Sequence, residues 1–248
     1  MSTSAPTIDR RSGFATVVDI IVSPSAAFAR LREAPTWGWA LLIATVLGVI
    51  GSLVVGPAIA HVLQTTLPAQ LAANPDIAKL PADQQQTMIA RTLSISSVVA
   101  QFSFVFVPIG ILIAALVQGL IMLIANAAAH GDGTFKKYFA LSVNVSVIGV
   151  GLSYLVVGII VLVRGANSFD STTAVQGAVP GLALLLPGAH GPLAGFFGSM
   201  NVFSLWSIAL LALGMTGVGR IPRVAAWITA IVMLLLTACF AAYGARNG

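Results

Sequence analysis

The chain has 248 residues, of which 58% are hydrophobic and only 8% are charged. Because an ordinary soluble domain carries roughly a quarter charged residues, this composition excludes a typical water-soluble protein. The net charge is +5, but the basic side chains flank apolar stretches and do not gather in one patch, so nucleic acid is not an expected partner.

Charged side chains are missing from long apolar stretches. None occurs between residues 91 and 132, 137 and 164, 170 and 220, or 223 and 246. An uncharged apolar run of about 18 residues or more can cross a hydrocarbon core of about 30 Å as a helix. The alternation typical of strands is absent. The sequence therefore predicts an all-α fold, a polytopic membrane helical bundle of about five transmembrane helices.

Residues 1–36 precede the first apolar stretch and are predicted to form an amphipathic helical leader. Apolar residues recur with helical spacing at Phe14, Val17, Val18 and Ile21. Ser23 followed by Pro24 is typical of a second helix start. The leader is either a structured cytosolic segment or a pair of helices in the headgroup layer, with its basic side toward anionic lipid. It does not resemble a signal peptide, so we expect the first span to be retained.

Residues 37–248 are predicted to form the membrane domain. Its five spans are expected at about 37–63, 94–128, 139–163, 200–218 and 224–243. Pro108 should kink the second span. The polar segment 65–91 is expected to be a water-exposed loop with short helices. We expect 165–198 to be an extracytoplasmic loop with an interfacial or re-entrant piece, because irregular backbone is unstable in hydrocarbon.

The distribution of basic residues predicts the orientation. With the N-terminus inside, the cytoplasmic segments hold eight of the twelve basic residues, including Lys136, Lys137, Arg220 and Arg223. Basic residues resist translocation across the membrane. The N-terminus is therefore predicted to be cytoplasmic and the C-terminus extracytoplasmic.

Several small or polar side chains are predicted to lie at membrane depth. A stripe of small residues follows the helical repeat in the third span at Ser142, Ser146, Gly149 and Ser153. A second set, spaced by seven, is Asn144, Gly151 and Gly158. The amides expected at this depth are Gln101, Gln118, Asn126, Asn144 and Asn201. Small residues favour close helix association, and buried amides need partners, so these residues either join helices or line a neutral polar path.

No catalytic, cofactor-binding or metal-binding site is predicted. His61, His130 and His190 lie on different segments. Cys239 is the single cysteine, which leaves neither an intramolecular disulfide nor a cysteine metal site. The seven carboxylates are scattered over both sides of the bilayer. No charged residue lies within a span, which argues against an ion-coupled carrier.

Three segments resemble bacterial members of the Yip1 domain family. They are the leader from Ile20 to Phe28 followed by Trp37, the segment from Gly131 to Lys137 before the third span, and Trp206 in the fourth span before a short basic turn. The resemblance covers nearly the whole chain and implies a five-span membrane domain with a cytosolic N-terminus. Eukaryotic members act in vesicle trafficking with Rab-type GTPases. The Asp-Leu-Tyr-Gly-Pro segment of that branch is absent here, so a GTPase partner is not carried over.

These observations predict a non-enzymatic, multi-pass protein of the bacterial inner membrane with a membrane-organising or partner-binding role. Its expected partners are the lipid bilayer and either another membrane protein or a second copy of the chain. The alternative is a permease, channel or lipid-translocating protein with a neutral polar path between helices. Amides that converge on a continuous groove would favour the alternative, and amides paired inside dry helix contacts would oppose it.

Overall fold

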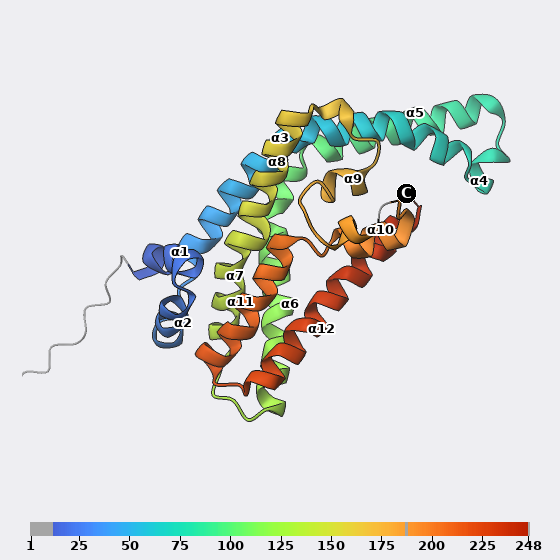
Figure 1. The fold of residues 1–248 in the computed structure, drawn as a ribbon. Coiled ribbons are helices and arrows are strands. Elements are labelled where there is room, and N and C mark those ends of the chain that lie inside the picture. Colours follow the sequence, from blue (N-terminus) through green and yellow to red (C-terminus); the bar gives the residue numbers. More distant parts are fainter. Residues whose placement is uncertain (1–11, 187, 248) are drawn as a thin grey trace, which may run out of the picture.

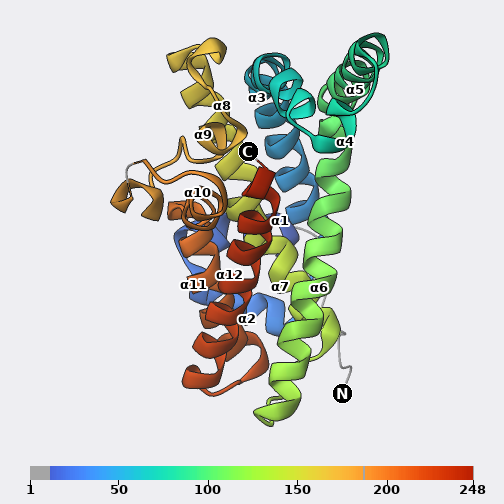
Figure 2. The ribbon, with the colours of Figure 1, turned by 90° about the vertical axis from the view of Figure 1, so that its right-hand side faces the viewer.

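The computed structural model describes residues 12–186 and 188–247. Among these residues the only β-type pairing is an isolated bridge between Gly181 and Asn201. Five helical segments are long and apolar enough to cross a membrane. They run side by side along the molecule (Figures 1 and 2), which confirms the predicted all-α membrane bundle. The spans are α3 (Gly38–Ala72), η1 with α6 (Ser103–Val105, Phe106–Ala128), α7 with η2 and α8 (Phe135–Ser146, Val147–Leu152, Ser153–Arg164), α11 (Val202–Gly219) and α12 (Arg223–Gly244).

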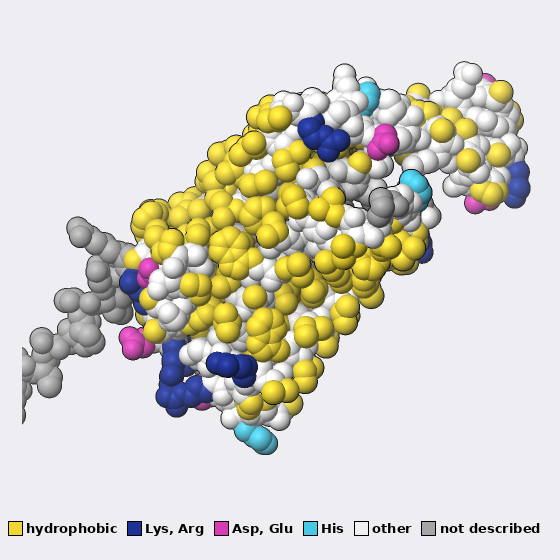
Figure 3. All heavy atoms as spheres, in the orientation of Figure 1, with side chains coloured by type: hydrophobic (Ala, Val, Ile, Leu, Met, Phe, Trp, Pro, Cys, Tyr) yellow, Lys and Arg dark blue, Asp and Glu magenta, His cyan; other side chains and the backbone are white. Residues whose placement is uncertain are grey.

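The outer surface of the bundle is apolar. Figure 3 shows hydrophobic side chains over the middle of one face, with the charged side chains and histidines toward its ends. Leu162, Val163 and Phe240 are 69%, 81% and 76% exposed. In water such a continuous apolar surface is a liability, whereas in hydrocarbon it is solvated. The structure therefore fits a protein whose middle is surrounded by lipid.

The leader forms a helical hairpin, α1 (Ser12–Val22) and α2 (Pro24–Glu33), joined at Ser23. Arg30 pairs with Asp19 at 2.9 Å across the hairpin. The hairpin packs against α3, α7 and α11. Ile20 and Leu31 are fully buried. We call this end of the molecule, which also carries the turns at 129–134 and 220–222, the α2 end.

The predicted apolar face of α1 is only partly buried. Of its residues, Val17 is buried, whereas Phe14 and Val18 are exposed, and Thr16 outside that face is buried. The reason is that α1 is apolar nearly all round, so helical spacing alone did not select the side that meets the bundle. Phe14 lies edge-on to Trp39 of α3, and Val18 and Val22 form an exposed apolar strip on α1.

The segment after the first span is helical and not mainly a loop. α3 continues to Ala72, past the expected end near residue 63, and contains Pro57 and Pro68. Its 35 residues extend about 52 Å as helix, well beyond the roughly 30 Å of a hydrocarbon core. After α4 (Pro75–Ala78), α5 (Ala82–Gln101) returns alongside α3. Figure 1 shows this α3–α5 arm projecting from the bundle.

The predicted kink at Pro108 is wrong. The helix breaks earlier, at Phe102 and the short η1 (Ser103–Val105), and α6 begins at Phe106. Pro108 then lies in the first turn of α6, where a missing N–H removes no intrahelical hydrogen bond. The expected second span of 94–128 is therefore two elements, the end of the arm and α6.

The third span contains a feature that the sequence analysis did not predict. Residues Val147–Leu152 form a π-helical segment, η2, between α7 and α8. Such a segment adds residues to the turn and changes the direction of every side chain that follows. Consequently, a shared face in an ideal α-helix does not guarantee a shared neighbour for residues before and after η2.

The other end of the bundle is closed by the chain between α8 and α11, and we call it the α10 end. It contains η3 (Ala166–Ser168), α9 (Thr172–Gln176), η4 (Leu182–Leu185) and α10 (Gly191–Gly198), and η5 (Ala245–Asn247) follows α12. α10 packs closely on α12, since a Cβ on Gly195 would lie 3.0 Å from the carbonyl carbon of Ala241. The expected loop at 165–198 is thus a folded cap that contacts α3, α8 and α12.

Candidate functional site

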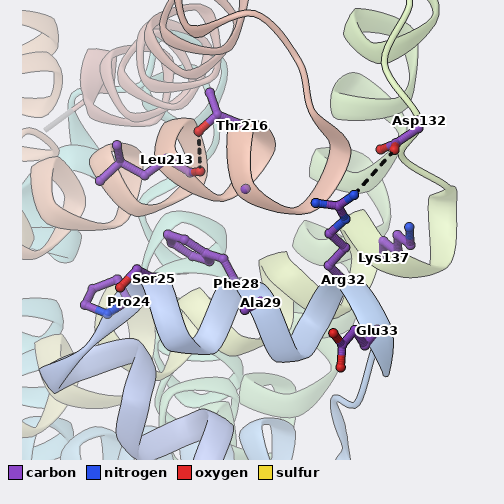
Figure 4. Close-up of a pocket in the computed structure, with 11 residues that line it drawn as sticks. Pro24, Ser25, Phe28, Ala29, Arg32, Glu33, Asp132, Lys137, Leu213 and Thr216 are labelled. Carbon is purple, nitrogen blue, oxygen red and sulfur yellow. Dashed lines mark hydrogen bonds and ion pairs between the residues drawn. The ribbon is translucent and has the colours of Figure 1, made fainter.

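A groove of about 890 Å³ lies at the α2 end between α2 and α11. Figure 4 shows the side chains that surround it. They come from α2, from the turn after α6, from α7 and from α11: Pro24, Ser25, Phe28, Ala29, Arg32, Glu33, Asp132, Lys137, Leu213, Thr216 and Gly217. We call this the α2–α11 groove. Its walls are brought together by the packing of the leader on the bundle.

The floor of the groove is apolar. Phe28 points from α2 toward α11 (Figure 4) and is 5% exposed. Its Cβ lies 3.0 Å from the position that a Cβ on Gly217 would take, so the glycine permits this close approach. Leu213 remains 40% exposed beside it. The hydroxyl of Thr216 donates to the Leu213 carbonyl at 2.7 Å, so it is already used within α11.

One rim of the groove is charged. The Asp132 carboxylate accepts ion pairs from Arg32 at 3.9 Å and from Arg220 at 3.4 Å. All three side chains are at least one-third exposed, and exposed pairs of this kind contribute only ~0–1 kcal/mol. Lys137 lies on the same rim. The groove thus holds two basic side chains, Arg32 and Lys137, and two acidic ones, Glu33 and Asp132. Arg220 adds a third cation next to it.

The turn that carries Asp132 is held by a buried hydrogen-bond network. Asn126 Oδ1 accepts from the Tyr138 hydroxyl at 2.7 Å and from the Gly133 N–H at 2.9 Å. Its Nδ2 donates to the Gly131 carbonyl at 3.2 Å. The backbone N–H of Asp132 donates to the Gly219 carbonyl at 2.9 Å, which ties the turn to the end of α11. The turn is thus a fixed part of the groove.

Positive charge dominates the α2 end. The described residues 12–36, 129–137 and 220–223 contain six basic side chains and three acidic ones, a formal excess of three positive charges. Arg220 ends α11 in the left-handed conformation, with φ of 52°. This conformation is strained for a non-glycine residue, and it places the guanidinium next to the Asp132 turn.

The predicted amides do not meet in one place. Gln118 accepts from the hydroxyl of Ser142, joining α6 to α7. Asn126 organises the turn described above. Asn144 donates to the carbonyls of Thr36 at 2.9 Å and Ala140 at 2.8 Å. Asn201 caps α11 by accepting from the N–H groups of Phe203 and Ser204, each at 3.0 Å. Gln101 is exposed at the end of α5. The other four amides are each used locally, and they form no continuous polar groove.

The predicted stripe of small residues does not face one neighbour. Ser142 bonds to α6, and Ser146 donates to the Val143 carbonyl of its own helix at 2.7 Å. A Cβ on Gly149 would lie 2.7 Å from Ser207 Oγ of α11. Ser153 lines a second cavity, toward α3 and α6. The physical reason is η2, which rotates Gly149 and Ser153 away from the face of Ser142.

The second predicted set does face a single partner. Asn144 bonds to the backbone just before α3. A Cβ on Gly151 would lie 3.3 Å from the Cα of Ala44, and one on Gly158 would lie 3.3 Å from the Cβ of Val54. α3 therefore packs along the whole of the third span at these three positions.

The comparisons identify the family. The model of the Yip1 domain matches residues 18–244. The chain belongs to the Yip1 domain family. A second comparison finds the membrane protein YknW of Bacillus subtilis (strain 168), which is 30% identical over 243 residues, covering 95% of this chain and 94% of that protein. No solved structure matches significantly.

The Yip1 match includes the α2–α11 groove, since its lining residues run from Pro24 to Gly217. In the sequence, the segment from Gly131 to Lys137 contributed only to the family resemblance, and no local pattern joined Phe28, Leu213 and Lys137 into one site. Among the described residues of this Yip1-family chain, no group of three or more His, Cys, Asp or Glu side chains could hold a metal ion. The groove combines an apolar floor with cations, an arrangement suited to binding.

Proposed function

We propose that this Yip1-family chain is a non-enzymatic, membrane-organising or partner-binding protein of the bacterial inner (plasma) membrane. The α2 end faces the cytoplasm and the α10 end faces outward, so the N-terminus is inside and the C-terminus outside. The excess of basic residues at the α2 end supports this orientation, because such residues are enriched on the cytoplasmic side. A bacterial relative that is itself described as a membrane protein supports the location.

The observation that carries the proposed role is the α2–α11 groove. Its apolar floor of Phe28 and Leu213 fits an apolar side chain of a partner. Its cations, the half-buried Arg32 and Lys137 and the adjacent, exposed Arg220, fit an acidic group beside that side chain. Charge complementarity of this kind sets the choice of partner and speeds association. We therefore propose that the groove binds a cytoplasmic segment of another membrane protein that carries both features.

The local use of the four amides supports binding over transport. A neutral solute path requires polar groups that continue from one end to the other, whereas these amides bond within helix contacts or cap a helix. The enzymatic alternative has little support from the groove, because its Asp132 carboxylate is engaged by two arginines and its Thr216 hydroxyl donates within α11.

Photo-crosslinking in native membranes tests the proposal. p-Benzoyl-phenylalanine replaces Ala29 or Thr216 in the groove, and Val18 on the exposed side of α1 serves as the control position. A discrete crosslinked protein from the groove positions, absent from Val18, is the expected result. A crosslinked second copy of the chain would identify the partner as a homo-oligomer.

Charge reversal at the basic residues of the groove tests whether these residues contribute to partner binding. The double variant Arg32→Glu and Lys137→Glu is expected to weaken capture about tenfold, or ~1.4 kcal/mol. Lys79→Glu is the matched control, since Lys79 is 77% exposed and lies in the arm, between α4 and α5. Equal capture by all three proteins would contradict the proposed site. Absence of any protein partner, together with solute or lipid flux in liposomes, would favour the transport alternative.

A further inference from the structure

A second cavity, of about 690 Å³, lies among the spans toward the α10 end. α3, α6, α8 and α12 all contribute to it, and α9 with the start of α11 covers it at the α10 end. Its volume is within the range of about 300–1,000 Å³ that is typical of ligand sites. Protein interiors are otherwise close-packed. A space of this size between membrane helices is therefore a candidate ligand-binding site.

Glycines keep the cavity open. Gly56 of α3, Gly110 of α6 and Gly198 of α10 line it, and a Cβ added at any of them would meet nothing within 4 Å. Elsewhere on α3 the opposite holds, since a Cβ on Gly51 would lie 2.7 Å from the backbone nitrogen of Leu155. α3 and α8 are therefore in tight contact at Gly51, and they stay packed beyond it through Ala58, Val62 and Val161. The cavity lies beside this contact, on the face of α3 that carries Gly56.

The chemistry of the lining selects the ligand class. Among the described residues around the cavity there is no acidic, basic or histidine side chain. The walls formed by the spans are mostly apolar, for example at Ile111 and Val150, with hydroxyl side chains at Ser52, Ser103, Ser153, Tyr154 and Thr237. The amide side chains of Gln176 and Asn201 come from the segments that cover the cavity. An elongated ligand with an apolar tail and a neutral polar region matches this gradient. A charged solute does not.

We propose that the cavity binds an acyl chain of a phospholipid taken from the leaflet at the α10 end. The chain would lie between α3, α6 and α8, and the ester region would lie near Gln176 and Asn201. The occupant is a lipid because hydrocarbon is the solvent around these spans and the cavity is lined by apolar walls at that depth. This site is separate from the α2–α11 groove and does not depend on the proposed partner.

Filling the cavity tests the proposal. Gly56→Leu and Gly110→Leu place a side chain in open space from two different helices, so neither is expected to disturb packing. Gly38→Leu is the matched control, because Gly38 also lies on α3 and has nothing within 4 Å, but is outside the cavity. Size-exclusion chromatography and circular dichroism check that all three variants fold.

The probe is a phosphatidylcholine with a diazirine at the end of one acyl chain, in vesicles of phosphatidylethanolamine and phosphatidylglycerol. We expect light-induced adducts on peptides containing Ile111 and Val157 in the wild type and in Gly38→Leu. Both filled variants should lose these adducts, while labelling at the lipid-facing Leu162 stays unchanged. Native mass spectrometry should show a phospholipid that is retained by the wild type and lost from the filled variants. Adducts at Leu162 only, or equal labelling of the cavity in all proteins, would overturn the proposal.

Discussion

Replacing Asn126 by alanine should loosen the turn that shapes the α2–α11 groove. The side chain is 7% exposed and makes three hydrogen bonds, with Tyr138, Gly133 and Gly131. Its removal leaves the Tyr138 hydroxyl and the Gly133 N–H without their acceptor. Each unsatisfied buried group costs ~1–3 kcal/mol, and hydrogen bonds between membrane helices average about 0.6 kcal/mol. We therefore expect the free energy of unfolding to fall by about 2–3 kcal/mol.

Equilibrium unfolding in mixed detergent micelles, followed by tryptophan fluorescence, measures this change. Asn74→Ala is the control, because Asn74 also caps a backbone N–H, that of Asp76 at 3.0 Å, but at an exposed site. It should cost at most ~1 kcal/mol. Tyr138→Phe should cost about 1 kcal/mol, and the double variant should cost less than the sum, since the two residues share a bond. If Asn126→Ala is no less stable than Asn74→Ala, the network does not hold the turn.

Four further substitutions test the packing and the helix ends. Gly51→Ala should destabilise the fold by about 2 kcal/mol through overpacking against the backbone of α8, whereas Gly56→Ala, which meets open space, should be neutral or slightly stabilising in the same unfolding assay. Arg220→Gly should change stability by less than ~1 kcal/mol, since the relief of the left-handed strain offsets a weak ion pair. Pro108→Ala should also cost less than ~1 kcal/mol, because the residue lies in the first turn of α6. A loss of about 3 kcal/mol there would instead indicate an interior position.

The solvent and the number of spans could be predicted from the sequence. Long runs without charge are a local property, and hydrocarbon accepts only backbone that satisfies its own hydrogen bonds. The five apolar helices follow from this. The polar composition of residues 65–91 indicated that water surrounds this segment, but it did not predict its conformation. In the structure the segment is helical, because α3 continues into it and α5 follows.

The direction in which each side chain points was decided by the tertiary structure. The π-helical segment η2 sends Gly149 toward α11 and Ser153 toward a cavity, although the α-helical repeat placed them beside Ser142. No local pattern revealed η2, since its residues are as apolar as those around it.

Both candidate sites depend on contacts between distant parts of the chain. The α2–α11 groove joins Phe28 to Gly217, and the second cavity joins Gly56 to Asn201. The sequence by itself determined that lipid surrounds the helices, because hydropathy is summed residue by residue. Which helices are in contact, and where a cavity remains between them, depends on the rotation of each helix about its axis and on the distances between helices. Those quantities exist only once the bundle is assembled.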